Sequence, residues 1–219
     1  MKVTGTDFGR DIIPALQQEG RLLGYNFSQH NVVPGYIWDS QKKTEVLTPQ
    51  THDSNYWEDA GTIAVYHHTQ MDLVGITPRF NIYPPIDFHH FSKSSTYWPL
   101  RASLHQYGPM KITREAMPRD CILSEGIILS AAHTSRCVFS PRVRVEDSTL
   151  ENCVIFEGAE ILNSRLSNVI VDKNARLDGV EIGHGKTPDP TIYLDKSGIH
   201  VVPRNFGRPD FNRALYTKT

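Results

Sequence analysis

The chain has 219 residues, enough for one large domain or two small ones, and 39% of them are hydrophobic. With 21% charged residues and a net charge of −1, the composition is typical of a soluble globular protein and gives no reason to expect nucleic acid or membrane as a partner. No apolar run approaches the roughly 18–20 residues of a membrane-spanning helix, and the amino terminus lacks the apolar core of a secretion signal.

Residues 1–27 are predicted to form a helix followed by a strand. Thr6 and Asp7 can cap a helix through residues 11–17, and Gly20 ends it. The alternation of apolar residues over 21–27 favours a strand. Residues 28–54 carry prolines, a glycine and many polar groups, so we expect a long surface loop there.

A second helix is predicted directly after residues 56–62, which combine an aromatic pair, an acidic residue and a turn of small residues. Thr62 is the expected cap, and Gly75 is the expected end. One apolar face would consist of Ile63, Tyr66, Met71 and Val74. Residues 76–110 contain several prolines and a polar stretch, and they are interpreted as a linker.

From Cys121 to Gly183 aliphatic residues recur at about every five or six positions, although the register slips between His133 and Val145. A helix needs returns at three and four, and a strand needs a period of two, so this spacing predicts a parallel β-helix whose coils bury one another. An ordinary meander of short strands is the alternative. The residues expected to point inward are Ile122, Ile128, Val138, Val145, Leu150, Ile155, Ile161, Leu166, Val171, Leu177 and Ile182.

The three cysteines, Cys121, Cys137 and Cys153, lie 16 positions apart, which could bring them close together on successive coils. Their odd number argues against a disulfide framework, and we expect buried thiols in a reducing cytoplasm. After the repeat, residues 192–194 and 199–202 are predicted to form a closing hairpin, and residues 207–219 a loose polar tail.

Few residues carry an independent sign of chemistry. Asp7, Phe8 and Gly9 spell the metal-binding triplet of protein kinases, but no other kinase motif is present, and the spacing makes Asp7 a helix cap. Asp59 could cap a helix or hold Mg²⁺, which prefers one or two carboxylates together with phosphate oxygens. The histidine pairs 67–68 and 89–90 lack ligand geometry, because adjacent residues on a helix point apart.

Five stretches occur in a fixed order around the repeat: Asp-Phe-Gly-Arg-Asp-Ile-Ile-Pro at 7–14, Tyr-Trp-Glu-Asp-Ala-Gly-Thr at 56–62, Met-Asp-Leu at 71–73, Phe-Asn-Ile-Tyr at 80–83 and Lys-Ser-Gly-Ile-His-Val-Val at 196–202. Together they resemble the carboxy-terminal half of bacterial glucose-1-phosphate adenylyltransferase (ADP-glucose pyrophosphorylase), over nearly the whole chain. The resemblance implies a left-handed parallel β-helix preceded by the final α/β segment of a Rossmann-like nucleotidyltransferase domain. The expected domains are 1–83, a linker at 84–110, and the β-helix with its hairpin at 111–219.

The resemblance also implies an activity and a set of site residues. The family makes ADP-glucose and pyrophosphate from ATP and glucose 1-phosphate. By residue-to-residue correspondence, Asp59 matches a catalytic aspartate that helps hold Mg²⁺, while Asp7, Phe8 and Trp57 match positions lining the glucose 1-phosphate pocket. Phosphorylated effectors of the family bind at the junction of its two domains through basic residues, for which the candidates are Lys196, Arg204 and Arg176; a solvated surface charge is the alternative for each of these three.

The departures from the family limit what these residues can do. The glycine-rich nucleotide loop, the second metal aspartate and the sugar-phosphate lysine do not occur in the 219 residues, and a cradle for ATP phosphates needs such a loop. We therefore predict that this chain alone does not synthesise ADP-glucose, and that it either is a fragment of the enzyme or needs an amino-terminal catalytic half as its partner. The apolar faces within 1–83 are expected to pack on that half.

Two other functions stay open. The first is a non-catalytic β-helix that mediates oligomerisation or regulates a complete subunit. The second is a hexapeptide acyltransferase, for which His133 and His184 are the only histidines in or beside the repeat that could act as a general base. Because the open ends of a β-helix expose backbone edges, we expect a homo-oligomer, a dimer or a tetramer.

Overall fold

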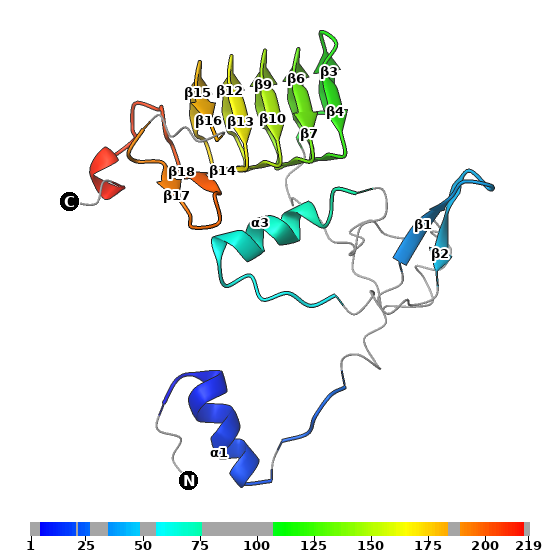
Figure 1. The fold of residues 1–219 in the computed structure, drawn as a ribbon, viewed down its shortest axis with the longest axis vertical. Coiled ribbons are helices and arrows are strands. Elements are labelled where there is room, and N and C mark those ends of the chain that lie inside the picture. The colour runs from blue at the N-terminus through cyan, green and yellow to red at the C-terminus, as the bar shows by residue number, and fades with distance from the viewer. Residues whose placement is uncertain are drawn as a thin grey trace.

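The computed structural model describes residues 5–20, 22–26, 35–48, 56–75, 107–183 and 189–216. Its largest part is a parallel β-helix that begins at Lys111, and helix α3 (Ile63–Met71) lies against one side of it (Figure 1). The predicted β-helix is therefore confirmed, because strands that neighbour one another within a face are parallel and belong to successive coils, which a meander does not produce.

Three sheets form the faces of the β-helix. The first face consists of β3 (Lys111–Thr113), β6 (Ile128–Ser130), β9 (Arg144–Glu146), β12 (Glu160–Leu162) and β15 (Arg176–Asp178). The second face consists of β4 (Met117–Arg119), β7 (His133–Ser135), β10 (Thr149–Glu151), β13 (Arg165–Ser167) and β16 (Glu181–Ile182). The third face consists of β5 (Ile122–Leu123), β8 (Val138–Phe139), β11 (Val154–Ile155), β14 (Val169–Val171), β18 (His200–Val202) and β17 (Tyr193–Leu194).

In the first coils of the β-helix, the side chains that point into the core lie one position later in the sequence than the aliphatic pattern predicted. Leu129 and Phe139 are fully buried, whereas the expected Ile128 is 37% exposed. Ile122 and Val138 likewise turn outward and pack beside α3 instead of in the central core. The remaining residues of the prediction, from Val145 to Ile182, do lie in that core: Val145, Leu150, Ile155, Ile161, Leu166, Val171, Leu177 and Ile182.

The apparent slip near residue 133 lies in the aliphatic pattern and not in the chain. Thr134 is paired with Leu150 in the neighbouring coil and is almost fully buried, so a polar residue occupies an inward position there. From β6 onward, partners on the first face stay 16 positions apart, as in Ile161 and Val145. The strand register between successive coils is therefore constant through this region.

The corners of the coils hold residues with positive φ. One corner carries Asp120, Arg136, Asn152 and Asn168, whose φ angles are 48°, 52°, 51° and 55°. The next carries Ala131, Asp147, Asn163 and Gly179, with φ between 46° and 67°. Asn, Asp and Gly are the residues that adopt this left-handed conformation most readily, so the local sequence favours a turn at most of these corners.

The carboxy-terminal end of the β-helix is covered by the chain itself. The predicted closing hairpin is confirmed, since β17 pairs antiparallel with β18 around the turn at Ser197. Beyond it, the Arg176 backbone N–H donates to the Phe206 carbonyl over 2.7 Å. The expectation of a loose tail is wrong for the described residues up to 216, because the Phe206 and Phe211 rings meet edge-to-face and the Phe211 and Tyr216 rings stack beside the 3₁₀ helix η4 (Arg213–Leu215).

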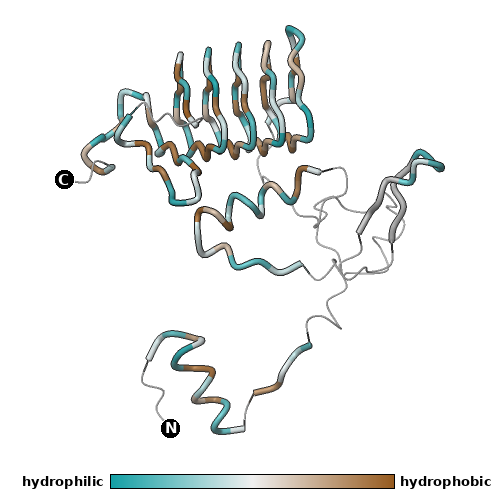
Figure 2. Tube along the Cα trace, viewed as in Figure 1, coloured by the Kyte–Doolittle hydropathy of each residue, from teal (hydrophilic) through white to brown (hydrophobic). Residues whose placement is uncertain are grey.

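Helix α3 confirms the second predicted helix, with Thr62 as its cap, but its partner differs from the expectation. The predicted apolar face packs on the outer side of the third face of the β-helix, where it meets Val154, Ile170 and Ile199. Figure 2 shows hydrophobic residues along the side of the β-helix that α3 approaches. The expectation that every apolar face within 1–83 packs on a preceding domain is therefore wrong for α3.

The amino-terminal residues match the predictions less well. A π-helix η1 (Phe8–Ile12) and α1 (Ile13–Gln18) replace the single helix, and residues 22–26 do not form a strand. The expected loop of 28–54 contains an antiparallel hairpin of β1 (Gly35–Asp39) and β2 (Thr44–Thr48). A Rossmann-like segment is not shown by the described residues before 76, and the predicted boundary at 83 and most of the linker lie outside the described residues. Within the described parts, no helix is long and apolar enough to cross a membrane.

Candidate functional site

The segment 56–62 is anchored to α3 at both of its ends. At one end the Tyr56 hydroxyl donates to an Asp72 carboxylate oxygen over 2.9 Å, and burial together with this bond raises the pKa of Tyr56. At the other end the Thr62 hydroxyl accepts the backbone N–H of Val65 at 3.2 Å, which satisfies one of the free donors at the start of the helix. The position of α3 thus determines the position of this segment.

Trp57 and Asp59 lie on this anchored segment and face solvent. The Trp57 side chain is 76% exposed, and Asp59 is exposed as well. A carboxylate oxygen suits Mg²⁺, but one carboxylate is too few to hold it without further ligands. Among the described residues no three His, Cys, Asp or Glu side chains gather closely enough for a metal ion. These residues by themselves therefore do not fit Mg²⁺.

Asp7 and Phe8 lie at the start of η1, on a different part of the chain. The Asp7 carboxylate accepts the Arg10 backbone N–H at 2.7 Å, so Asp7 caps η1 as its spacing predicted. Phe8 is 70% exposed. Figure 1 shows α1, which follows η1, well apart from α3, so the structure does not bring Asp7 and Phe8 together with Trp57 and Asp59.

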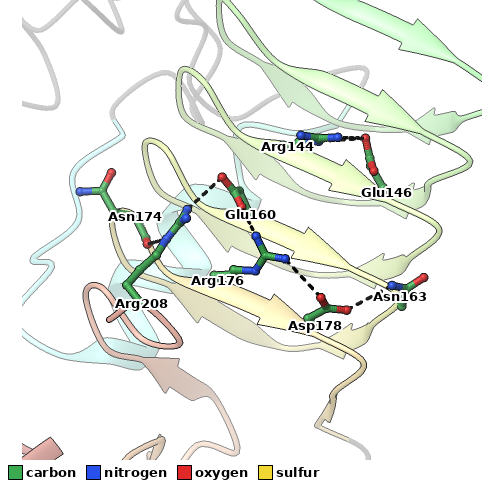
Figure 3. Close-up of polar contacts among 8 residues, drawn as sticks. All are labelled: Arg144, Glu146, Glu160, Asn163, Asn174, Arg176, Asp178 and Arg208. Carbon is green, nitrogen blue, oxygen red and sulfur yellow. Dashed lines mark hydrogen bonds and ion pairs between the residues drawn. The ribbon is translucent and has the colours of Figure 1, made fainter. Parts of the chain in front are cut away.

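The three basic candidates lie near the carboxy-terminal end of the β-helix. Arg176 on β15 is already engaged, since its guanidinium lies 3.1 Å from Glu160 and 3.4 Å from Asp178 (Figure 3). Arg208 adds a second pair with Glu160 at 3.0 Å and donates to the Asn174 carbonyl. A phosphate at Arg176 would have to compete with two carboxylates.

Lys196 and Arg204, the other two basic candidates, are exposed. Lys196 lies in the turn of the β17–β18 hairpin, where Asp195 is occupied by hydrogen bonds from Ser197 that hold the pKa of its carboxyl below the usual range. Nothing in the geometry of the described residues gathers these two cations around one point. Their assignment to effector binding stays a prediction.

His67 and Arg208 make contacts that the sequence did not predict, since His67 was considered only as part of a rejected metal-binding pair. His67 is 7% exposed, and its Nε2 donates to the Asn152 carbonyl of the β-helix over 2.7 Å. A signal for His67 was present, because Ile63, His67 and Met71 follow one another at helical spacing on a single face. No comparable pattern marks Arg208, whose partners Glu160 and Asn174 are far from it in the sequence.

The cysteines lie one above another on successive coils, as their spacing suggested. Each thiol donates to the carbonyl two positions before it, at 3.1 Å for Cys121 and Cys153 and 3.2 Å for Cys137. The neighbouring Cys137 thiol and burial raise the pKa of Cys121, so the group stays protonated and unreactive. All three are free thiols; Cys137 and Cys153 are buried as expected, whereas Cys121 is only partly buried.

A shallow, polar pocket of about 340 Å³ lies over the corner between the first and second faces. Its lining includes Asp147, Asn163, Arg165 and Gly179. Asp147 is paired with Arg114 over 2.8 Å, and Asn163 donates to Asp178, so these two lining groups already have partners within the chain.

Comparison with known proteins supports the resemblance seen in the motifs. Residues 109–202 match the family described as GlmU-like, C-terminal hexapeptide. A glucose-1-phosphate adenylyltransferase of Deinococcus deserti is 31% identical over 213 residues, which cover 92% of this chain and 45% of that protein. One of Anaeromyxobacter sp. is 29% identical over 209 residues, with 90% and 45% covered. The chain spans about half the length of these curated relatives, and it is a homologue of glucose-1-phosphate adenylyltransferases that corresponds to their carboxy-terminal half.

Proposed function

We propose that this chain acts as the carboxy-terminal part of a glucose-1-phosphate adenylyltransferase, in the cytoplasm, and takes part in making ADP-glucose and pyrophosphate from ATP and glucose 1-phosphate. The observation that carries the proposal is the continuous similarity to such enzymes over 92% of the chain. The structure supports it by joining the segment 56–62, through α3, to a β-helix of hexapeptide repeats. A β-helix alone would not favour this activity over others, because fold does not determine function.

Four residues are proposed to contribute to substrate binding. Asp59 would supply one oxygen ligand to Mg²⁺, with the remaining ligands coming from outside the described residues. Asp7 would accept hydrogen bonds from sugar hydroxyls, and Phe8 and Trp57 would cover the apolar side of the glucose ring. Exposed aromatic side chains suit this role, because they offer a large flat apolar surface at low cost in conformational entropy.

The complete site requires an amino-terminal catalytic region, which we propose as the principal partner. Phe8, Leu23, Tyr25 and Trp57 are 70%, 98%, 68% and 76% exposed, so large apolar side chains face solvent on several of the described segments before residue 76. Such surfaces commonly mark contacts with other protein parts. The absence of a glycine-rich phosphate loop from the 219 residues agrees with this requirement, since ATP would otherwise lack a binding cradle.

A pyrophosphate-release assay tests the proposal. The purified chain with ATP, glucose 1-phosphate and Mg²⁺ should show no turnover above background, and co-expression with the amino-terminal half of a related enzyme should restore it. Asp59→Asn should abolish the restored activity, while Asp39→Asn, on the β1–β2 hairpin, should leave it unchanged. Turnover by the chain alone, or restored activity that is indifferent to Asp59→Asn, would contradict the proposal.

A non-catalytic oligomerisation or regulatory module is the second candidate. It is favoured by the separation of the predicted site residues, which lie on two segments that the structure does not bring together. This module would bind intact adenylyltransferase subunits without rescuing an isolated amino-terminal half. In either case the proposed contacts for phosphorylated effectors are Lys196, Arg204 and Arg176, the last after its release from Glu160. Calorimetry that compares the unchanged chain with the triple alanine variant tests this proposal.

A further inference from the structure

The contact between α3 and the β-helix is largely apolar but contains a buried histidine, a side chain whose ordinary pKa lies near neutral pH. His67 is 7% exposed and lies on the same helix as Met71, which packs with Val154 and Ile170 of the third face. Nearby, the rings of Tyr66 and Phe156 stack with their centroids 6.4 Å apart. The imidazole is therefore enclosed by the surfaces that hold the helix in place.

The hydrogen bond of His67 shows which ring nitrogen carries a proton in the docked form. Its Nε2 lies 2.7 Å from the carbonyl oxygen of Asn152, and a carbonyl accepts only, so Nε2 carries the proton. Asn152 is a corner residue with φ of 51°, and its side-chain oxygen accepts from Arg136 Nε at 3.1 Å. A neutral imidazole is enough for this arrangement, because only Nε2 has to carry a proton and Nδ1 can stay unprotonated.

A second proton would place a positive charge in this contact. The charged or titratable groups that face His67 are Arg136 on the β-helix and His68 on α3 itself, and neither supplies negative charge. Burial is the largest influence on the pKa of His67 and lowers it; the hydrogen bond to Asn152 raises the pKa by less, and His68 and Arg136 each lower it a little further. Burying an uncompensated charge is costly, so the docked helix resists protonation.

We infer that His67 makes the docking of α3 on the β-helix sensitive to pH, because a protonated imidazole would introduce positive charge into the apolar contact beside Arg136. The sign follows from linkage. The imidazole of His67 binds a proton less readily in the docked form than in the undocked form. Protonation therefore favours the undocked form, so docking is strongest at neutral pH and weakens as the pH falls below about 6.5.

The consequence for activity rests on the proposed function. Because Tyr56 and Thr62 tie Trp57 and Asp59 to α3, undocking the helix would release the two predicted site residues from their fixed position relative to the β-helix. Acidification would then disconnect the β-helix from the catalytic region. His67 is in this sense a positioning residue and does not itself contact substrate.

Amide hydrogen exchange of α3 in the full chain tests the inference without any assay of activity. The protection factors of residues 63–71, corrected for intrinsic exchange, should fall by up to about tenfold when the pH is lowered from about 7.5 to 5.5. Tenfold is the upper limit because the imidazole in the undocked form has a pKa of about 6.5. His67→Gln, which can still donate to Asn152 but cannot be charged, should remove this pH dependence. His68→Gln, at the exposed neighbouring position, should retain it.

Retained pH dependence in His67→Gln, or its absence in the unchanged chain, would overturn the inference. If His67→Gln prevents docking even at neutral pH, NMR titration of the imidazole in the unchanged chain decides instead. A midpoint below about 6.5, accompanied by shifts in α3, supports the inference, and a midpoint at or above that value overturns it. Failure of the complementation assay would leave this result intact, so the two proposals can fail separately.

Discussion

The corners of the β-helix show how single residues decide the path of the chain. Equivalent corners in successive coils have positive φ whether they hold Asn163 and Gly179 or Ala131, although an alanine gains nothing from this conformation. The left-handed region costs an ordinary residue roughly 1–2 kcal/mol. Asn, Asp and Gly can be recognised as turn residues in a sequence, but Ala131 gives no such signal, because the neighbouring coils impose its conformation.

Replacing Ala131 by glycine is therefore expected to stabilise the protein. Ala131 has a φ of 48°, and removing its Cβ relieves the strain while adding a smaller entropic cost, for a net gain of about 0.5–1 kcal/mol. Denaturant unfolding followed by circular dichroism measures it. The control is Ala132→Gly, at a fully buried neighbouring position, which should lower stability by about 1 kcal/mol. A lower unfolding midpoint for Ala131→Gly would contradict the argument.

The corrected position of the inner column can be tested at two adjacent residues. Leu129 has no exposed surface, and its truncation to alanine should cost about 2–5 kcal/mol because it leaves a cavity. Ile128→Ala should cost less than about 1 kcal/mol, since that side chain is 37% exposed. The aliphatic period alone predicts the reverse order, so thermal unfolding of the two variants decides which residue points inward.

At the scale of the elements, local signals predicted the start of α3 better than its end, which is at Met71 and not at Gly75, or the elements that it contacts. Thr62 and the apolar spacing correctly predicted the start of α3 and its buried side, yet they could not reveal that this side meets the β-helix. The hairpin β1–β2 was missed, because loop-like composition over 28–54 outweighed the short strands that pair across Lys42. The prediction of a strand at 21–27 was wrong for 22–26, because these residues alternate in hydrophobicity but do not pair with another strand in the described structure.

The segment covering the carboxy-terminal end of the β-helix depends on one glycine. Gly207 has a φ of 72°, and a Cβ there would meet the Arg176 carbonyl, the strand edge on which this segment lies. Gly207→Ala should lower the free energy of unfolding by at least about 2 kcal/mol and increase exchange around Phe206. Gly179→Ala is the matched control: its φ is 67° and nothing lies within 4 Å, so only the conformational cost of about 1 kcal/mol applies. Equal losses in both variants would count against a close contact at Gly207.

At the scale of the whole molecule, the β-helix was predictable and the candidate site was not. Each coil contacts only its neighbours, so a period in the sequence is enough to specify the fold. The predicted site is different, because Asp7 and Asp59 belong to segments whose approach depends on contacts that no local pattern encodes. The resemblance to a family supplied their roles, and the structure supplied only their surroundings. Arg176 is an example: the sequence shows that this residue is charged, but only the structure shows that its guanidinium is paired with the carboxylates of Glu160 and Asp178.

The two ends of the β-helix differ, and the difference leads to a prediction about assembly. At the carboxy-terminal end Ile192, Val202 and Phe206 complete the core. At the amino-terminal end β3, β4 and β5 are edge strands, each with one neighbour among the described strands, and Ile112 and Met117 are 46% and 45% exposed. Unpaired strand edges beside apolar side chains are a surface on which a second copy can add.

We therefore expect a dimer or a tetramer at micromolar concentration, measured by light scattering coupled to size-exclusion chromatography. Ile112→Lys should shift the chain towards monomer, because a charge at the exposed end of the core would have to be desolvated on assembly. Leu215→Lys, at a side chain 74% exposed near the opposite end, should leave the mass unchanged. A monomer for the unchanged chain would contradict assembly through the β-helix. Loss of assembly with Leu215→Lys alone would move the interface to the carboxy-terminal end, where the core is already closed by the chain's own residues.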